Sequence, residues 1–341
     1  MKLLRFLLFP FAILYDLITS VRNFLFDVQI LSSTSFKTPV IIVGNLNVGG
    51  TGKTPQIEYL IRLLKDKKKV AVLSRGYKRK TSGFLLLDRT HTATDAGDEP
   101  LQYFKKFSKI QVVVDENRVH GINKLLKNNN SPELILLDDA FQHRKVNPGF
   151  SILLTKYNDL FSDDFLLPTG NLRESRRGVK RANVVIVTKC PKKLRESEQQ
   201  KIRKRLHPKE NQQVFFTTIS YVEKLQGFND LTLSELKEYE VLLITGIANP
   251  TPLLQFLNTK SIKYSHLEFT DHHHFSKNEI AKIQLTYKKM ASPKKLIVTT
   301  EKDFVRLSNK IKELSYLEIK TIFLESQHEK FDRLITDFVK C

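Results

Sequence analysis

Short apolar runs separated by polar stretches dominate the pattern of this chain and predict alternating strands and helices. A β-branched run at 39–43 ends in Gly44 and Asn45, and a Gly-rich loop and a helical pattern at 55–64 follow it. Similar runs recur through the first two-thirds of the chain, at 70–73, 110–114, 134–137, 152–154 and 184–187. Continuous apolar strands with helix-like stretches between them are typical of a parallel sheet flanked by helices. We therefore expect an α/β fold.

A second set of runs predicts a smaller α/β unit in the last third of the chain. A basic helix at 195–206 precedes this set, and a helical pattern at 277–290 interrupts it. Its strands are expected at 241–245, 264–269, 296–299 and 321–324. We place the boundary near residue 220, which gives a larger domain at 28–220 and a smaller one at 221–341.

The first 27 residues predict an amphipathic helix, with one apolar face and one polar face. A membrane-spanning helix needs about 20 predominantly apolar residues, and Arg5, Pro10 and Asp16 interrupt this run. A signal peptide is disfavoured because no small-residue cleavage site follows. Two alternatives remain: the helix docks on the protein's own core, or it lies in a membrane interface, which we favour. The interface anchors would be Phe6, Phe9, Phe11, Phe24 and Phe26.

Composition supports a large folded core and an anionic partner. The chain has 341 residues, 41% of them hydrophobic, and a formal net charge of +20. This charge predicts attraction to nucleic acid, an anionic membrane face or a phosphorylated substrate, without choosing among them. Basic runs at 62–69 and 192–209 also suit ordinary solvated helix faces. Cys190 and Cys341 lack metal or disulfide spacing, which fits a reducing cytosol.

The junction of the first predicted strand and helix carries the segment Gly49-Gly50-Thr51-Gly52-Lys53-Thr54. Backbone N–H groups and a helix dipole at such a junction cradle phosphates, as in the P-loop of nucleotide-binding proteins. Lys53 would reach the β- and γ-phosphates, and Thr54 would bind Mg²⁺. Asn47 replaces the usual first glycine, a mild departure because asparagine tolerates left-handed backbone angles. The fold prediction becomes a P-loop NTPase-like parallel sheet.

A P-loop normally needs a carboxylate at the end of a nearby strand to hold Mg²⁺. The apolar run at 134–137 ends in Asp138 and Asp139, at the edge where α/β sheets place ligands. Ordinary solvated acids at a strand end are the simpler alternative. The continuous apolar run favours the metal-binding interpretation.

An acceptor-activating base is the next requirement, and two segments offer one. The first is Gly97-Asp98-Glu99-Pro100 and the second is Asp271-His272-His273-His274. A carboxylate beside a histidine can share an acceptor's proton, but both types are common in caps and on surfaces. Sequence spacing cannot show that they meet. A basic group around Gly170-Asn171-Leu172-Arg173-Glu174 suits phosphate oxygens or a plain surface cluster equally well.

Taken together, these segments resemble the tetraacyldisaccharide 4′-kinases, the lipid A 4′-kinases of Gram-negative bacteria. The resemblance covers nearly the whole chain, and its ordered set of motifs is far more specific than a P-loop alone. It rests on the segments quoted above and on Val43-Gly44-Asn45, Ser74-Arg75-Gly76-Tyr77, Ala140-Phe141-Gln142-His143, Thr245-Gly246-Ile247-Ala248-Asn249-Pro250 and Thr300-Glu301-Lys302-Asp303.

The resemblance implies transfer of the ATP γ-phosphate to the 4′-hydroxyl of a tetraacylated, 1-phosphorylated glucosamine disaccharide, in a cleft that closes between two lobes. It implies that Asp98 is the base, supported by the Asp271-His272 pair. It further implies a nucleotide site, a Mg²⁺ site and substrate contacts. The nucleotide site would comprise Asn47, Gly49, Gly50, Thr51, Gly52, Lys53 and Thr54. The Mg²⁺ site would comprise Thr54, Asp138 and Asp139. The substrate contacts would come from Glu99, Asn171, Arg173 and Glu174.

An acylated anionic substrate would explain both the amphipathic N-terminus and the basic charge. The resemblance then implies a peripheral protein on the cytoplasmic face of the inner membrane, with no nucleic acid and no obligate protein partner. Two alternatives remain from the residues alone: a nucleic-acid-stimulated P-loop ATPase, and a membrane-docked ATPase whose output is conformational.

Overall fold

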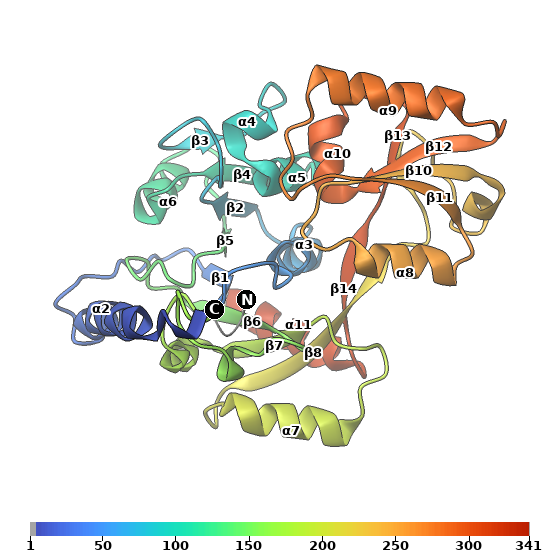
Figure 1. Ribbon diagram of the computed structural model, residues 1–341. Coiled ribbons are helices and arrows are strands. Elements are labelled where there is room, and N and C mark those ends of the chain that lie inside the picture. The colour runs from blue at the N-terminus through green and yellow to red at the C-terminus, as the bar shows by residue number, and fades with distance from the viewer. Residues whose placement is uncertain (1–4, 341) are drawn as a thin grey trace.

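The computed structural model describes residues 5–340, which build two sheets with helices packed around them (Figure 1). The larger sheet has nine strands and the smaller has five. In spatial order the larger sheet contains β14 (Ile319–Phe323), β8 (Gln213–Tyr221), β7 (Val184–Thr188), β6 (Phe150–Lys156), β1 (Val40–Asn45), β5 (Leu134–Asp138), β2 (Val70–Ser74), β4 (Ile110–Val114) and β3 (Leu85–Leu86). The smaller sheet contains β11 (Lys263–Glu268), β10 (Glu240–Thr245), β12 (Lys295–Thr300), β13 (Leu314–Leu317) and β9 (Gln226–Gly227).

Helices connect most of the parallel strands, as the alternating sequence pattern predicts. The α-helices are α2 (Phe9–Asp27), α3 (Lys53–Leu64), α4 (Ala93–Ala96), α5 (Asp98–Lys106), α6 (Arg118–Leu126), α7 (Glu196–Leu206), α8 (Thr251–Thr259), α9 (Lys277–Lys289), α10 (Glu301–Leu307) and α11 (Gln327–Lys340). Short 3₁₀ helices are η1 (Phe161–Asp163), η2 (Arg176–Arg181) and η3 (Glu235–Glu238).

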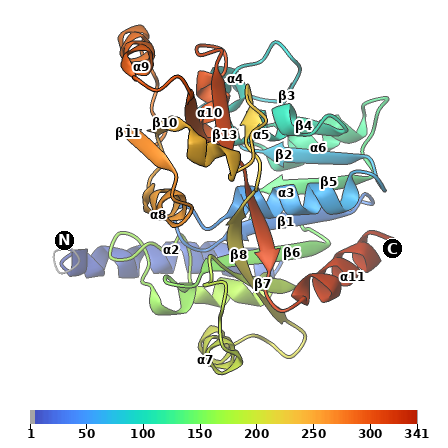
Figure 2. The ribbon, with the colours of Figure 1, turned by 90° about the vertical axis from the view of Figure 1, so that its right-hand side faces the viewer.

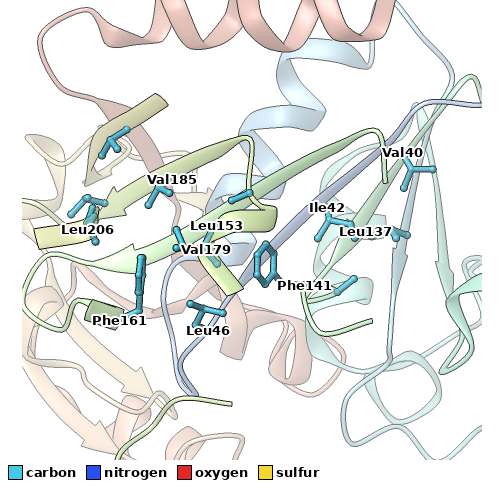
Figure 3. Close-up of a cluster of buried hydrophobic side chains, with 14 of the residues drawn as sticks. Val40, Ile42, Leu46, Leu137, Phe141, Leu153, Phe161, Val179, Val185 and Leu206 are labelled. Atoms are coloured by element: carbon cyan, nitrogen blue, oxygen red, sulfur yellow. The ribbon is translucent and has the colours of Figure 1, made fainter. Parts of the chain in front are cut away.

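The centre of the larger sheet is buried on both faces. Every residue of β1, β2, β5 and β7 is buried, which explains why these strands are apolar without alternation. Side chains on one face form a core that includes Ile42, Leu137, Leu153 and Phe161 (Figure 3). The strand β1 lies between β5 and β6 and is parallel to both. The predicted parallel α/β sheet is confirmed.

The end of the chain departs from the expected smaller domain at 221–341. The strand β14 pairs antiparallel with β8, so this segment joins the edge of the larger sheet. The helix α11 follows it, and its fully buried Phe331 contacts the rings of Tyr59, Phe215 and Phe323. Figure 2 shows β14 and β8 side by side, and together they form one edge of the larger sheet. A five-residue apolar strand does not specify its partner, because pairing is decided by distant segments.

The helix α2 lies along the larger unit and presents apolar side chains outward. Pro10 sits in its first turn, where proline is tolerated, so it starts the helix rather than breaking it. Polar groups make several of its contacts to the rest of the protein: the hydroxyl of Tyr15 donates to the backbone oxygen of Arg173, and Asn23 Nδ2 donates to Glu174. At the start of the helix the ring of Phe9 also contacts Phe165. Within α2 only Ala12 and Thr19 are buried. The alternative in which its apolar face docks on the core is therefore wrong.

Among residues 5–340, α2 alone is long and apolar enough to cross a membrane, and only 11% of it is buried. Its exposed apolar side chains include Leu14, Leu17, Ile18 and Val21, which lie on one face at helical spacing. A large exposed apolar surface of this kind marks an interaction site.

We predict that Phe331→Ala destabilises the larger unit by about 3–5 kcal/mol, because it removes a buried ring from an aromatic cluster. Urea unfolding followed by circular dichroism measures the change. Phe228→Ala is the control, because this phenylalanine is 58% exposed and its loss should change the free energy of unfolding by at most about 0.5 kcal/mol. Equal effects in the two variants would contradict the placement of α11 on the larger sheet.

Candidate active site

The glycine-rich loop lies between β1 and the N-terminus of α3. Gly52 is the residue before the helix and has a φ of 88°, a left-handed conformation that glycine adopts without strain. Lys53 is the first helical residue. The Thr51 side chain is buried, and its hydroxyl accepts a hydrogen bond of 2.9 Å from Asn45 Nδ2. The loop therefore aims the free N–H groups of a helix N-terminus at the carboxyl edge of the sheet.

Asn47 has a structural role in this loop. It is absent from the described residues with positive φ, so the left-handed backbone that the sequence interpretation invoked is not adopted. Its buried side chain instead donates a hydrogen bond of 2.9 Å to Asp164. Backbone hydrogen bonds from Val48 to Asn171 and from Arg173 to Leu46 extend the same connection. The loop is thereby fixed to the segment that carries Asn171 and Arg173.

Two residues that sequence reasoning missed support the loop from the end of β7. The hydroxyl of Thr188 donates to the backbone oxygen of Thr51 at 2.7 Å. The ammonium of Lys189, a residue with a φ of 58°, donates to the backbone oxygen of Gly50 at 2.8 Å. These bonds hold the backbone oxygens of Thr51 and Gly50 to the end of β7. The only sequence signal is that both residues end an apolar strand at the ligand edge.

Asp138 ends β5 beside β1, Asp139 follows it, and the two have opposite electrostatic environments. Asp138 is buried; burial first, and then the charge of Asp139, raises its pKa to about 6. Burial alone would also raise the pKa of Asp139, but Lys53 and Arg173 outweigh it and hold that pKa below the usual range. Lys53 Nζ lies 3.6 Å from Asp139 Oδ1, and Arg173 Nη1 lies 3.0 Å from it.

The carboxylate of Asp138 leaves room for a cation. Its Oδ2 accepts hydrogen bonds from Ser74 and Tyr103, both at 3.3 Å, whereas its Oδ1 is buried and has no partner within residues 5–340. The Tyr103 phenol also contacts Thr54. No group of three or more His, Cys, Asp or Glu in this part of the chain has metal-binding geometry. The residues therefore fit an ion such as Mg²⁺ that takes few protein ligands and completes its shell with phosphate and water.

The structure brings Asp98 and His272 together, although they are 174 positions apart in the sequence. His272 Nδ1 and Asp98 Oδ2 are 2.9 Å apart. Asp98 begins α5, and His272 has a φ of 59°, a strained backbone for a residue with a side chain. Gly97 precedes Asp98 with a φ of 90°, and a Cβ atom there would lie 3.0 Å from the backbone oxygen of Tyr77. This turn thus requires glycine.

Two cations of α10 complete this cluster, and sequence reasoning assigned a role to neither. Arg306 donates from Nε and Nη2 to the two oxygens of Asp98. Lys302 Nζ lies 3.0 Å from His272 Nε2 and 2.9 Å from Asp271 Oδ1. Burial alone would raise the pKa of Asp98, but the hydrogen bonds from Arg306 and His272 outweigh it and hold the pKa well below its usual range.

The other expected acceptor-side residues divide into three groups. Glu99 is half-buried and its charge acts on Asp138. Asn171 and Arg173 are held at the same edge, the former by Arg5 at 3.2 Å. Glu174 is fully buried: its carboxylate accepts hydrogen bonds from Arg181 at 2.8 Å, Gln142 at 3.0 Å and Asn23 at 2.9 Å. Glu174 is therefore a structural centre of this surface.

A cavity of about 270 Å³ opens beside this edge, between the N-terminus of α6 and the segment 143–146. Its lining includes Arg118, His143 and Lys145. Arg118 is buried, and its Nη2 lies 3.4 Å from the backbone oxygen of Asp138. Burial first, and then the charges of Arg118 and Arg75, lowers the pKa of His143 to about 4. The lining therefore combines two cations, Arg118 and Lys145, with one acid, Glu116, and with a histidine that its low pKa keeps uncharged at neutral pH.

A phosphate-binding loop, a carboxylate at the end of the adjacent strand and an Asp–His pair together define a P-loop phosphotransferase. The comparisons give its family. The profile of the tetraacyldisaccharide-1-P 4′-kinase family matches residues 4–340, and the chain belongs to this family and is a kinase. The resemblance seen in the sequence is confirmed.

Individual relatives agree with the family. The chain is 54% identical to the tetraacyldisaccharide 4′-kinase of Flavobacterium johnsoniae, over 100% of this chain and 98% of that protein. It is 47% identical to the same enzyme of Bacteroides thetaiotaomicron, over 98% and 93%. The solved structures include "apo" form LpxK from Aquifex aeolicus in complex with ATP, with a TM-score of 0.79, 33% identity, and coverage of 98% of this chain and 99% of that chain.

We predict that Glu174→Ala lowers the free energy of unfolding by roughly 2–4 kcal/mol. The change leaves Arg181 without its buried partner, and partial solvation of that arginine keeps the loss below the largest values for such pairs. Chemical unfolding measures the change, with Glu210→Ala, an exposed acid, as the control. A loss of activity with unaltered stability would contradict the structural role.

Proposed function

We propose that this chain transfers the γ-phosphate of ATP to the 4′-hydroxyl of tetraacyldisaccharide 1-phosphate and so forms lipid IVA in lipid A biosynthesis. Family membership supports the acceptor, and the geometry of α5 supports the chemistry. The N-terminus of α5 carries Asp98, and one turn later its Tyr103 contacts Asp138 and Thr54. A single rigid helix therefore sets the separation between the candidate base and the phosphate loop, and this observation carries the proposal.

The nucleotide part of the proposal assigns the triphosphate to the loop from Gly49 to Thr54, with Asn47 holding the loop in place. The match to a solved structure of the same family in complex with ATP supports this assignment. Thr54, Asp138 and Asp139 would hold Mg²⁺, which neutralises charge that develops on the phosphate oxygens. Lys53 would act on the same charge, a role that the position of its ammonium beside Asp139 supports.

On the acceptor side, we assign to Asp98 the role of accepting the proton of the sugar hydroxyl, with His272 and Asp271 as its support. The pKa of Asp98 lies below its usual range, so its carboxylate is ionised at neutral pH and free of its own proton. Glu99, Asn171 and Arg173 would contact the sugar headgroup, and Glu174 would act by positioning this surface. The cations Arg118 and Lys145 in the lining of the cavity would favour the anionic end of the substrate.

We predict that Lys53→Ala abolishes phosphate transfer and that Asp98→Ala slows the chemical step by about 10²–10⁴-fold, the usual range for a general base. The assay incubates the enzyme with ATP, Mg²⁺ and the disaccharide lipid and detects the added phosphate by mass spectrometry. Lys312→Ala, which changes an exposed lysine, is the control. Unchanged turnover in Asp98→Ala would remove it from this role, and absence of any lipid product from the wild type would refute the function.

We further propose that the protein is peripheral to the cytoplasmic face of the inner membrane and is held there by α2. The net charge of +20 suits an anionic lipid surface or nucleic acid alike, and the exposed apolar face of that helix favours the lipid surface. The polar contacts of Tyr15 and Asn23 join the helix to the loop that carries Arg173 and Glu174. If α2 lay half-buried in the membrane interface, it would hold the acceptor side of the site at the depth of the lipid headgroups.

We predict that combined replacement of Leu14, Leu17, Ile18 and Val21 by Gln weakens binding to vesicles of anionic lipid by about 10²-fold or more, since each change removes roughly 1 kcal/mol of apolar burial. Flotation of protein with vesicles measures the partitioning. Leu285→Gln, on the exposed face of α9, is the matched control. Equal flotation of the variant and the wild type would refute the assignment of α2 to the interface.

A further inference from the structure

The helix α10 of the smaller sheet's unit sends two cations to the Asp98–His272 pair. Lys302 and Arg306 are four positions apart, so they lie on one face of the helix. The Arg306 side chain is only 6% exposed. It also lies 3.4 Å from Asp303, whose other oxygen accepts the backbone N–H of Gly246. Arg306 is thus held on its own unit while it reaches across to Asp98.

The hydrogen bonds to Asp98 use most of its acceptor capacity. An ionised carboxylate offers about four lone-pair positions, two on each oxygen. Both positions of Oδ2 are used, by Arg306 Nη2 and by His272 Nδ1. Oδ1 accepts from Arg306 Nε at 2.8 Å. One acceptor position therefore remains, and it is on Oδ1.

The surrounding donors also select one tautomer of His272. The ammonium of Lys302 can only donate, so His272 Nε2, 3.0 Å away, must be the acceptor. The ring proton then lies on Nδ1 and is donated to Asp98 Oδ2. Because Nδ1 carries the ring proton, it cannot accept a hydrogen bond from Arg306. Arg306 Nη2 therefore donates to Asp98.

We infer that Arg306 is a positioning residue for the transfer reaction: its guanidinium fork, together with His272, fixes the Asp98 carboxylate so that only Oδ1 can accept the hydroxyl proton of the sugar. The inference rests on the proposed function. In that step the hydroxyl proton passes to Asp98 Oδ1, the hydroxyl oxygen bonds to the γ-phosphorus, and the bond from that phosphorus to the leaving diphosphate breaks. Arg306 exchanges no proton.

The arrangement exists only while α10 lies against α5. Figures 1 and 2 both show these two helices side by side, at the junction of the two units. Two other contacts join them: Lys105 Nζ donates to Ser308 at 3.1 Å, and Lys106 pairs with Glu301. Association of the smaller unit therefore orients the base as well as supplying His272.

The test compares Arg306→Met with the wild-type enzyme in the lipid kinase assay. We expect kcat to fall by about 10²-fold, the cost of misplacing a reacting group by about 1 Å, while KM for ATP changes by less than about twofold. The pH profile should change as well. Burial remains when the cation is gone, and it raises the pKa of Asp98. Activity should therefore be lost at a higher pH than in the wild type as the pH falls.

A conservative variant separates charge from geometry. Arg306→Lys keeps the positive charge but cannot bond both carboxylate oxygens at once. It should restore the wild-type pH profile while kcat stays low. Arg333→Met, which removes an exposed arginine of α11, is the matched control and should behave as wild type. Full kcat in both Arg306 variants, with a wild-type pH profile, would overturn the inference.

A double-mutant cycle with Asp98→Asn decides whether Arg306 acts through Asp98. If it does, Arg306→Met should cost nothing further in the Asp98→Asn background. If the losses of kcat in the two single variants add in the double variant, the inference is overturned, whatever the stability of the variants. Arg306 would then act by a route other than Asp98. Full turnover in Asp98→Asn alone would instead refute Asp98 as the proposed base. By contrast, impaired turnover in Asp98→Asn together with full turnover in Arg306→Met would refute only the role of Arg306.

Discussion

The parallel pairing of β1 with β5 is the constraint on which the rest of this site depends. Its register sets Val43 of β1 beside Asp138 of β5, so the loop that follows β1 emerges next to the carboxylates that follow β5. Parallel strands end at the same edge, and this brings together a loop of free N–H groups and a pair of acids far from it in sequence. The strand β7, which β6 separates from β1, ends in Thr188, and Thr188 and Lys189 donate hydrogen bonds to the same loop.

Burial and hydrogen-bond partners shift the pKa values of the carboxylates at this edge in opposite directions. Asp138 is buried with an unpaired oxygen, and its pKa is raised to about 6. Asp98 is half-buried, and hydrogen bonds from Arg306 and His272 hold its pKa below its usual range. Asp138 therefore has a buried oxygen that a cation could bind, whereas the hydrogen bonds of Asp98 keep its carboxylate ionised. Environments that separate two similar groups in this way are characteristic of sites with divided chemical roles.

The N-terminal helix links this edge to the outside of the molecule. Its polar side chains bond to the segment with Arg173 and Glu174, and Arg5 reaches Asn171 and the backbone oxygens of Pro168 and Gly170. The face left exposed is apolar. The usual order of a soluble amphipathic helix, apolar side inward, is therefore reversed, and the acceptor side of the site is coupled to the apolar surface.

The sequence determined the local structure and the chemistry of single segments. Apolar runs predicted the strands of the larger sheet, the Gly-rich segment predicted the loop before α3, and the ordered motifs indicated the family, because these signals lie within a few adjacent residues. Tertiary structure decided which segments meet. Sequence spacing left open whether Asp98 and His272 would meet, gave Arg306 no role, and placed β14 in the wrong sheet. These outcomes depend on long-range pairing, which no short stretch of sequence encodes.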